Sequence, residues 1–188
     1  LHNLSNITAA IAASRMIGID FIEIKKNIKY IKLPKKRFEF RGLIDERHLY
    51  DDYAHHPNEI KETIKLGRLF IKQKNNNEIH KNRLVAIFQP HRYSRAKQFT
   101  REFAEELSKA DVIYVTSIYG AGERNPEKIT SKIITDLIYK QNKNVSYINN
   151  YHEISKNLYE LTQKGDLILN MGAGDCHNFW SILNRKNN

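Results

Sequence analysis

Two different spacings of hydrophobic residues alternate along the chain beyond residue 37. Short apolar runs rich in β-branched or aromatic residues predict strands at His48–Tyr53, Leu84–Phe88, Val112–Thr116, Val145–Ile148 and Leu167–Met171. The segments between them repeat apolar residues every three or four positions, which predicts helices with one apolar stripe each: Phe99, Phe103 and Leu107; Ile129, Ile133 and Leu137; and Ile154, Leu158 and Leu161. This alternation predicts an α/β, doubly wound fold with a mainly parallel sheet and helices on both faces.

The first residues of the chain follow another pattern. From Asn3 to about Ile17 the sequence is rich in Ala and Ile on nearly every face, which predicts a buried helix that packs inside a larger body. A second helix is expected from Asp20 to about Tyr30. Pro34 then interrupts the helical pattern, so we divide the chain into a helical part, residues 1–36, and a second domain, residues 37–188.

The charge of the chain restricts its partners. It carries 31 Lys and Arg residues against 21 Asp and Glu residues, a formal net charge of +10. This excess suggests nucleic acid, a membrane surface or an anionic small molecule. The lysines are scattered without interleaved aromatic residues, which favours a solvated surface. The sign of the charge alone does not choose among these three partners. We expect no nucleic acid and no membrane as partner; a basic binding module for nucleotides or nucleic acid, without catalysis, is the alternative.

Several features indicate the compartment. No apolar run approaches the roughly 20 residues that span a bilayer, and the first residues lack the pattern of a signal peptide. The single cysteine, Cys176, cannot form an internal disulfide and fits a reducing compartment. We expect a cytoplasmic protein. Because the chain opens on Leu1 and enters a helix at once, we also expect it to be cut from a longer protein.

Polar or glycine-rich motifs follow four of the predicted strands. In chain order they are DDYAHHP, QPHRYSR, YGAGE and GAGD. Loops that leave the carboxyl ends of parallel strands converge on one crevice of the sheet. The sequence therefore predicts a single site at that edge.

The QPHRYSR motif contains Arg92 and Arg95, which lie between a strand end and a helix start. Both guanidinium groups can then face one mouth, beside free N–H groups at the helix N-terminus, which predicts a pocket for a carboxylate or a phosphate. The alternative is that the two arginines stabilise neighbouring loops through salt bridges.

The DDYAHHP motif brings two carboxylates, a phenol and two imidazoles to another strand end. One aspartate can accept hydrogen bonds from sugar hydroxyls or stabilise a cation, and a histidine can bind a substrate group. A zinc site is disfavoured, because no second group of His or Cys residues has the spacing of metal ligands, and we predict no metal site. A buried turn held by the Asp side chains is the structural alternative.

Two further motifs allow more than one interpretation. Asn3 and Asn6 share one face of the first helix, and an asparagine amide matches the N6 and N7 edge of adenine; a helix cap is the alternative for Asn3. The glycines of YGAGE and GAGD fit a dinucleotide site only weakly, because neither motif completes G-x-G-x-x-G. Glycines required by tight turns between strand and helix are the favoured interpretation.

Read in this order, HNLSN, KKRFEFRG, DDYAHHPNEI, FQPHRYSR, YGAGE and GAGD resemble the Mur ligase family over nearly the whole chain. DDYAHHP is shared in near form with the members that recycle murein tripeptide, whereas FQPHRYSR resembles the members that join L-alanine to UDP-N-acetylmuramate. The family implies three domains: one for the UDP-sugar, a central ATPase domain, and a Rossmann-like third domain. Residues 1–36 match the end of the central domain and residues 37–188 the third domain, so the remaining domains are expected elsewhere in the same protein.

The resemblance also implies an ATP-dependent amide ligase of peptidoglycan biosynthesis that works through an acyl phosphate, with Mg²⁺ bound mainly by the missing central domain. It implies adenine contacts at His2, Asn3 and Asn6, contacts to the ATP ribose and phosphates at Arg37 and Asp52, and contacts to L-alanine and the muramoyl carboxylate at Tyr53, His55, Arg92 and Arg95. Of these, it implies catalytic roles for Arg92, Arg95 and His55. Because the sequence contains no G-x-x-x-x-G-K-[ST] loop, we expect these residues alone to be inactive.

Overall fold

The computed structural model of the chain describes residues 2–30, 35–74, 82–176 and 178–184. The chain divides into two compact units, Leu1–Lys35 and Lys36–Asn188. This division lies one residue before the domain boundary that the sequence predicts. The assignment of the first unit to the end of an ATPase domain remains a prediction.

The first unit consists of α1 (His2–Met16), α2 (Phe21–Asn27) and a short 3₁₀ helix, η1 (Ile28–Tyr30). Asp20 caps α2, because its side chain accepts a hydrogen bond from the backbone N–H of Ile22 at 2.7 Å. Every described side chain of α1 is exposed or half-buried. Within the first unit, the described residues therefore do not bury this helix, and its packing inside a larger body remains a prediction.

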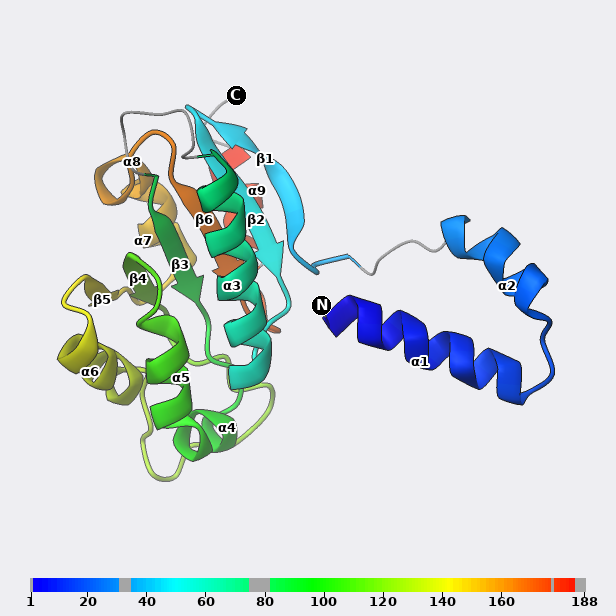
Figure 1. Ribbon diagram of the computed structural model, residues 1–188. Coiled ribbons are helices and arrows are strands. Elements are labelled where there is room, and N and C mark those ends of the chain that lie inside the picture. Colours follow the sequence, from blue (N-terminus) through cyan, green and yellow to red (C-terminus); the bar gives the residue numbers. More distant parts are fainter. Residues whose placement is uncertain (1, 31–34, 75–81, 177, 185–188) are drawn as a thin grey trace. The chain divides into compact units, whose positions relative to one another are not determined.

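The second unit is built on a six-stranded sheet with the strand order β1-β2-β6-β3-β4-β5 (Figure 1). The strands are β1 (Glu39–Ile44), β2 (Arg47–Asp52), β3 (Leu84–Phe88), β4 (Val112–Val115), β5 (Val145–Tyr147) and β6 (Leu167–Met171). All neighbouring pairs are parallel except β1 and β2, which form an antiparallel hairpin. Every residue of β3 and β6 is buried, as expected of central strands covered on both faces.

Helices cover both faces of this sheet and form two separate hydrophobic cores. One core contains residues of α3 (Pro57–Lys74), α4 (Tyr93–Gln98), α5 (Thr100–Leu107) and α6 (Lys132–Gln141). The other contains residues of α7 (Tyr151–Lys156), α8 (Leu158–Leu161) and α9 (Asn178–Asn184). The predicted fold class, a doubly wound and mainly parallel α/β sheet, is confirmed.

Three details of the prediction were wrong. The stripe of Ile154, Leu158 and Leu161 does not lie on one helix, because α7 ends at Lys156 and α8 begins at Leu158. The strand β1 was not predicted, because Phe40 and Leu43 are both more than half exposed and a bulge between Phe40 and Gly42 breaks the strand period. The stripe predicted on α6 is displaced by one residue: Ile134 and Ile138 are the buried side chains, and Ile129 lies before the helix begins. The loop Asn125–Ile129, closed by two hydrogen bonds of the Asn125 side chain, delays the helix start.

Candidate functional site

The structure brings the four motif loops together at the carboxyl ends of β2, β6, β3 and β4. Gly172 N–H donates to the carbonyl of Asp52 at 3.1 Å, which joins the loops after β6 and β2. The Gln89 side chain donates to Asp175 Oδ1 at 2.6 Å, which joins the loops after β3 and β6. The backbone of Arg92 donates to the carbonyl of Tyr119 at 2.8 Å, which joins the loops after β3 and β4. The convergence that parallel strands imply is therefore present.

One half of the site is a cluster of Arg37, Tyr53, His55 and Glu59. Nη1 of Arg37 lies 3.4 Å from Oε1 of Glu59, and the guanidinium stands 5.8 Å from the centre of the Tyr53 ring. The rings of Tyr53 and His55 pack edge to face at 5.2 Å. Arg37 and Tyr53 keep 36% and 38% exposure, so a cation and a phenol remain open to solvent at this edge.

Glu59 organises this cluster. Its Oε2 accepts hydrogen bonds from the backbone N–H groups of His55 at 3.0 Å and His56 at 3.2 Å, and lies 3.2 Å from Nδ1 of His55. Glu59 is the third residue of α3 and forms one half of a capping box, because its carboxylate accepts a hydrogen bond from the backbone N–H of His56, the residue before the helix. Burial opposes ionisation, but the hydrogen bonds from His55 and His56 and the charges of His55 and Arg37 outweigh it and lower the pKa of Glu59.

Asp52 holds the turn that precedes this cluster. Oδ2 accepts a hydrogen bond from Phe38 N–H and Oδ1 accepts one from Ala54 N–H, both at 2.8 Å. The side chain is buried, and burial raises the pKa of Asp52 above its usual value, although these hydrogen bonds and the nearby Arg37 oppose the rise. The buried-turn alternative therefore describes its contacts within this unit. A ribose contact would have to use the remaining lone pairs of the same two oxygens.

His91 lies at the centre of the other half of the site. Its ring stacks on Tyr119 with a centroid distance of 5.6 Å and an interplanar angle of 13°, and it meets the His55 ring edge to face at 5.7 Å. Nη1 of Arg95 lies 3.2 Å from Nδ1 of His91. Because arginine can only donate, this contact fits a neutral His91 ring whose proton is on Nε2.

The electrostatics of this half favour the neutral ring. Burial, followed by the charges of His55, Arg95 and Arg92, lowers the pKa of His91 below its usual value of 6.5. These charges act together on one imidazole, which agrees with a concentration of cations at this edge. His91 links the two halves of the site, since its ring contacts His55 on one side and Tyr119 on the other.

The two arginines of QPHRYSR have different partners. Nη1 of Arg92 lies 3.6 Å from Oε1 of Glu123, so a salt bridge to a neighbouring loop, the alternative from sequence, does form at this position. Arg95 contacts His91, and among the residues that the structure describes it forms no salt bridge with a carboxylate. The prediction of free N–H groups beside the arginines is wrong at Ser94, because its N–H donates to Oε2 of Glu123 at 3.0 Å. The carboxylate of Glu123 thus occupies the place at the start of α4 where we had expected a bound anion.

The glycines of YGAGE and GAGD allow close packing between loops. A Cβ atom on Gly174 would lie 2.6 Å from Oε1 of Gln89 and 2.6 Å from Cγ of Tyr119. A Cβ atom on Gly120 would lie 2.7 Å from the ring of Tyr93. These contacts support the favoured interpretation, in which the glycines serve the geometry of the turns.

The predicted adenine residues belong to the first unit. The side chains of His2 and Asn3 lie outside the described residues, and Asn6 is exposed on α1. The adenine contacts of these residues remain a prediction.

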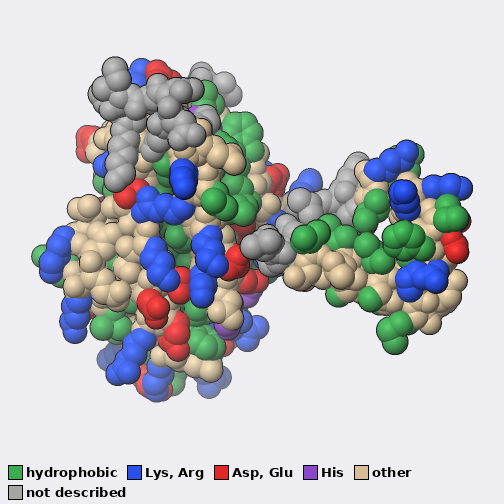
Figure 2. Space-filling view, viewed as in Figure 1, with side chains coloured by type: hydrophobic (Ala, Val, Ile, Leu, Met, Phe, Trp, Pro, Cys, Tyr) green, Lys and Arg blue, Asp and Glu red, His purple; other side chains and the backbone are tan. Residues whose placement is uncertain are grey.

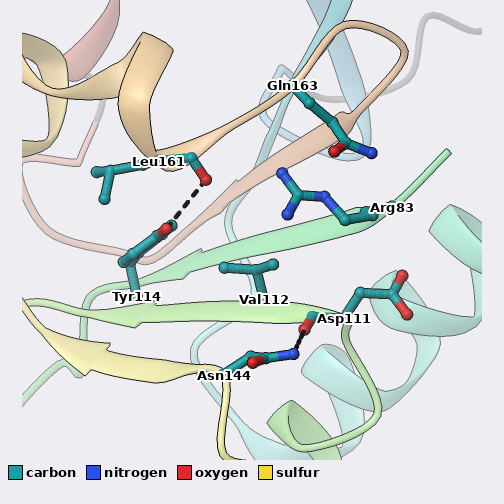
Figure 3. Close-up of a pocket in the computed structure, with 7 residues that line it drawn as sticks. All are labelled: Arg83, Asp111, Val112, Tyr114, Asn144, Leu161 and Gln163. Atoms are coloured by element: carbon teal, nitrogen blue, oxygen red, sulfur yellow. Dashed lines mark hydrogen bonds between the residues drawn. The ribbon is translucent and has the colours of Figure 1, made fainter.

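A hollow of about 550 Å³ lies at the amino ends of the strands, opposite the candidate site (Figure 3). It is lined by residues of β4, by residues that precede strands and by the end of α8: Arg83, Asp111, Val112, Tyr114, Asn144, Leu161 and Gln163. Its polar groups are used within the fold. Arg83 donates to both carboxylate oxygens of Asp166 at 3.1 and 2.7 Å, and the Tyr114 hydroxyl donates to the carbonyl of Leu161 at 3.1 Å. We therefore assign this hollow a structural role.

On one face of the second unit, the surface charge is dispersed. Figure 2 shows Lys and Arg side chains spread over the visible face of the second unit, with Asp and Glu side chains among them. Among residues 2–30, 35–74, 82–176 and 178–184, no cluster of three or more His, Cys, Asp or Glu side chains is arranged to hold a metal ion. None of the helices in these ranges is long and apolar enough to cross a membrane.

Comparison with known proteins identifies the family. The family profile described as "Mur ligase, glutamate ligase domain" matches residues 36–174, which include three of the four motif loops in full and all of the fourth except Asp175. The chain belongs to the Mur ligase family. The resemblance seen in the motifs is confirmed.

Mur ligases with curated names include similar sequences. A UDP-N-acetylmuramate--L-alanine ligase of Prochlorococcus marinus subsp. pastoris is 65% identical over 188 residues, covering 100% of this chain and 40% of that protein. A protein of the same name from Synechococcus elongatus is 44% identical over 178 residues, covering 94% of this chain and 37% of that protein. The chain thus spans about 40% of the length of these relatives.

Solved Mur ligase structures share the fold. The UDP-N-acetylmuramate-alanine ligase of Thermotoga maritima has a TM-score of 0.73 at 24% identity, covering 100% of this chain and 38% of that chain. A murein peptide ligase of Psychrobacter arcticus has a TM-score of 0.71 at 23% identity, covering 98% of this chain and 36% of that chain. At this identity the likeness concerns the fold.

Sequence reasoning gave no role to three residues of the Mur ligase motifs: Glu59, His91 and Glu123. Glu59 could have been found in part, because a Glu at the third helical position after a predicted start at Pro57 is one half of the capping-box signal, whose other half, a Ser or Thr before the helix, is replaced by His56. The contacts of His91 and Glu123 depend on which loops are neighbours across the sheet. Neither motif predicts the strand order that makes these loops neighbours.

Proposed function

We propose that this chain is the C-terminal part of an ATP-dependent ligase that joins L-alanine to UDP-N-acetylmuramate in peptidoglycan biosynthesis. The observation that carries the proposal is the FQPHRYSR loop, which brings Arg92, Arg95 and His91 to the carboxyl edge of the sheet beside His55. The names of the relatives that align over the whole chain support it. On this proposal the first unit, Leu1–Lys35, ends the central ATPase domain and the second is the third domain.

The substrates of this reaction are anions, and the site offers cations. Arg92 and Arg95 receive the carboxylates of L-alanine and of the muramoyl group, and Tyr53 and His55 bind beside them. A guanidinium fork binds a carboxylate through two parallel hydrogen bonds, so it orients the substrate as well as attracting it. The same fixed cations stabilise the negative charge that develops as the amide forms.

The described residues fit one part of a bound nucleotide. Arg37 presents a guanidinium that is 36% exposed, stacked on Tyr53 and held by Glu59, which suits a phosphate oxygen. Asp52 lies beside it, and His2, Asn3 and Asn6 are proposed for the adenine. ATP with Mg²⁺ supplies the phosphoryl group that activates the muramoyl carboxylate. We propose that the Mg²⁺ ligands belong mainly to the part of the protein outside this chain, that L-alanine attacks the resulting acyl phosphate, and that the enzyme is cytoplasmic.

The test is phosphate release by the full-length protein with ATP, Mg²⁺ and UDP-N-acetylmuramate. Three parallel reactions receive L-alanine, murein tripeptide or no acceptor. Release that requires L-alanine is the expected result. Release that requires tripeptide would transfer the proposal to the murein-recycling members of the family, and equal release in all three reactions would contradict it.

A further inference from the structure

Glu123, the last residue of the YGAGE motif, reaches across to the neighbouring FQPHRYSR loop. Its Oε1 accepts a hydrogen bond from the Ser94 hydroxyl at 2.7 Å, and its Oε2 accepts one from the Ser94 N–H at 3.0 Å. Oε1 also lies 3.6 Å from Nη1 of Arg92. One carboxylate therefore contacts both the first turn of α4 and the arginine that precedes it.

The backbone of Arg92 adopts a conformation that needs support. Its φ of 72° and ψ of 137° lie outside the regions that residues with a side chain usually occupy. The loop after β4 supplies the support, because Arg92 N–H donates to the carbonyl of Tyr119 and Tyr119 N–H donates to the carbonyl of Pro90, both at 2.8 Å. Unusual backbone conformations persist where their surroundings hold them, and they concentrate at binding sites.

The side chain of Arg92 also needs a partner that limits its freedom. It is 50% exposed, whereas Glu123 is 23% exposed and is held by two hydrogen bonds from Ser94. Those bonds, followed by the charge of Arg92, lower the pKa of Glu123 below its usual value, so the carboxylate is ionised at neutral pH. A guanidinium has five N–H groups, so one that pairs with Glu123 retains donors for a second anion.

We propose that Glu123 is a positioning residue for Arg92, which it orients to receive the carboxylate of L-alanine. The inference rests on the proposed function, because it requires Arg92 to bind a substrate anion. Glu123 acts through Arg92 and does not touch the substrate. By restricting the guanidinium before the substrate binds, Glu123 reduces the conformational entropy that Arg92 loses on binding.

The test compares three variants of the full-length enzyme by their KM for L-alanine, their kcat and their thermal midpoint. Glu123→Gln keeps an oxygen that can accept a hydrogen bond from Ser94 but loses the charge that faces Arg92. Glu123→Ala loses both. Glu127→Ala is the matched control. It removes a carboxylate from the same loop, but the partner of that carboxylate is Lys97, at 2.6 Å, and not Arg92.

For Glu123→Gln we expect a KM for L-alanine raised about tenfold, the scale of one charge-assisted contact, with a smaller change in kcat and an unchanged thermal midpoint. Glu123→Ala should raise the KM at least as much and also lower the midpoint, whereas Glu127→Ala should leave both near the wild type. A Glu123→Gln enzyme with wild-type KM would overturn the positioning role, as would a defect of equal size in Glu127→Ala.

A double mutant tests whether Glu123 acts through Arg92. In the Arg92→Lys background the planar fork is already lost, so adding Glu123→Gln should change the KM by less than about twofold. A full, multiplicative effect of the two substitutions would overturn the inference. Failure of the proposed function is recognised separately, since the wild-type enzyme would then lack L-alanine-dependent phosphate release before any variant is compared.

Discussion

At the scale of single residues, the site uses one arrangement twice. Glu59 accepts hydrogen bonds from the backbone N–H groups at the start of α3 and pairs with Arg37. Glu123 accepts one from the backbone at the start of α4 and pairs with Arg92. In both cases a carboxylate caps a helix and holds an arginine at the carboxyl edge of the sheet. The arginines carry the proposed binding role, and the carboxylates fix their positions.

Arg92→Ala in the full-length enzyme is expected to raise the KM for L-alanine strongly or to abolish turnover. Removing an arginine that pairs with a substrate carboxylate removes both a charge and an orienting contact, which together correspond to about a hundredfold loss in kcat/KM. Lys97→Ala is the control, because Lys97 is an exposed cation on α4 that pairs with Glu127. Steady-state kinetics measure both, and near-normal values for Arg92→Ala would refute its assignment.

His91 is expected to make stability depend on pH. The pKa of His91 is lowered in the folded chain, mainly by burial, whereas it returns to about 6.5 on unfolding. Between these values the unfolded state binds more protons, so the contribution to the free energy of unfolding is present above about pH 6.5 and is lost as the pH falls through the folded pKa.

Denaturant titrations of the 188-residue chain and of His91→Gln at a series of pH values measure this contribution. The unfolding free energy of the wild type minus that of His91→Gln should decrease as the pH falls from 7 into the acid range. A difference that stays constant or grows would mean that His91 does not favour its neutral form in the folded chain.

Residue roles were predictable from the sequence only in part. The motifs identify Arg92, Arg95 and His55 as residues with unusual chemistry at strand ends. They do not identify the partner of each residue, because the Glu123 contact joins loops about 30 positions apart in the chain. The prediction of free helix N–H groups beside Arg92 was wrong for the same reason, because Glu123 comes from another loop.

At the scale of elements, α3 lies unusually close to the sheet. A Cβ atom on Gly67 would lie 2.8 Å from Cδ1 of Leu84, 3.1 Å from Cδ1 of Leu169 and 3.3 Å from Cδ2 of Leu167. The glycine therefore permits an approach that a larger side chain would prevent. Because α3 directly follows β2 and the DDYAHHP loop, this packing also fixes the position of the end of that loop, where α3 begins.

Gly67→Val is expected to lower the free energy of unfolding by about 1 to 3 kcal/mol, because overpacking of the core outweighs the better helix propensity of valine. Leu66→Val is the control, since it places the same side chain at a neighbouring position that is 36% exposed. Urea denaturation of the 188-residue chain measures both. A Gly67→Val chain as stable as the wild type would show that α3 can move away from the sheet at no cost.

The elements themselves were largely predictable. Buried strands such as Leu84–Phe88 have continuous apolar sequences, and amphipathic helices such as α5 show their stripe directly. The edge hairpin was missed because β1 has outward-facing apolar residues and an irregular register. The strand order also lies beyond the motifs, since β6 inserts between β2 and β3 although it comes last in the chain.

At the scale of the whole molecule, the chain consists of two compact units, Leu1–Lys35 and Lys36–Asn188. The P-loop motif does not occur in the 188 residues. We therefore expect the chain alone to release no phosphate from ATP in the presence of UDP-N-acetylmuramate and L-alanine, whereas the full-length protein does. The same phosphate assay checks this, and turnover by the 188-residue chain would contradict the assignment of its two units.

The central claim is that this carboxyl-edge site serves a ligase that selects L-alanine. The most direct test gives the full-length enzyme ATP, Mg²⁺, UDP-N-acetylmuramate and equal concentrations of L-alanine and murein tripeptide. Mass spectrometry then identifies the products. The account predicts UDP-N-acetylmuramoyl-L-alanine as the dominant product. A dominant tripeptide adduct, or no adduct with either acceptor, would contradict it.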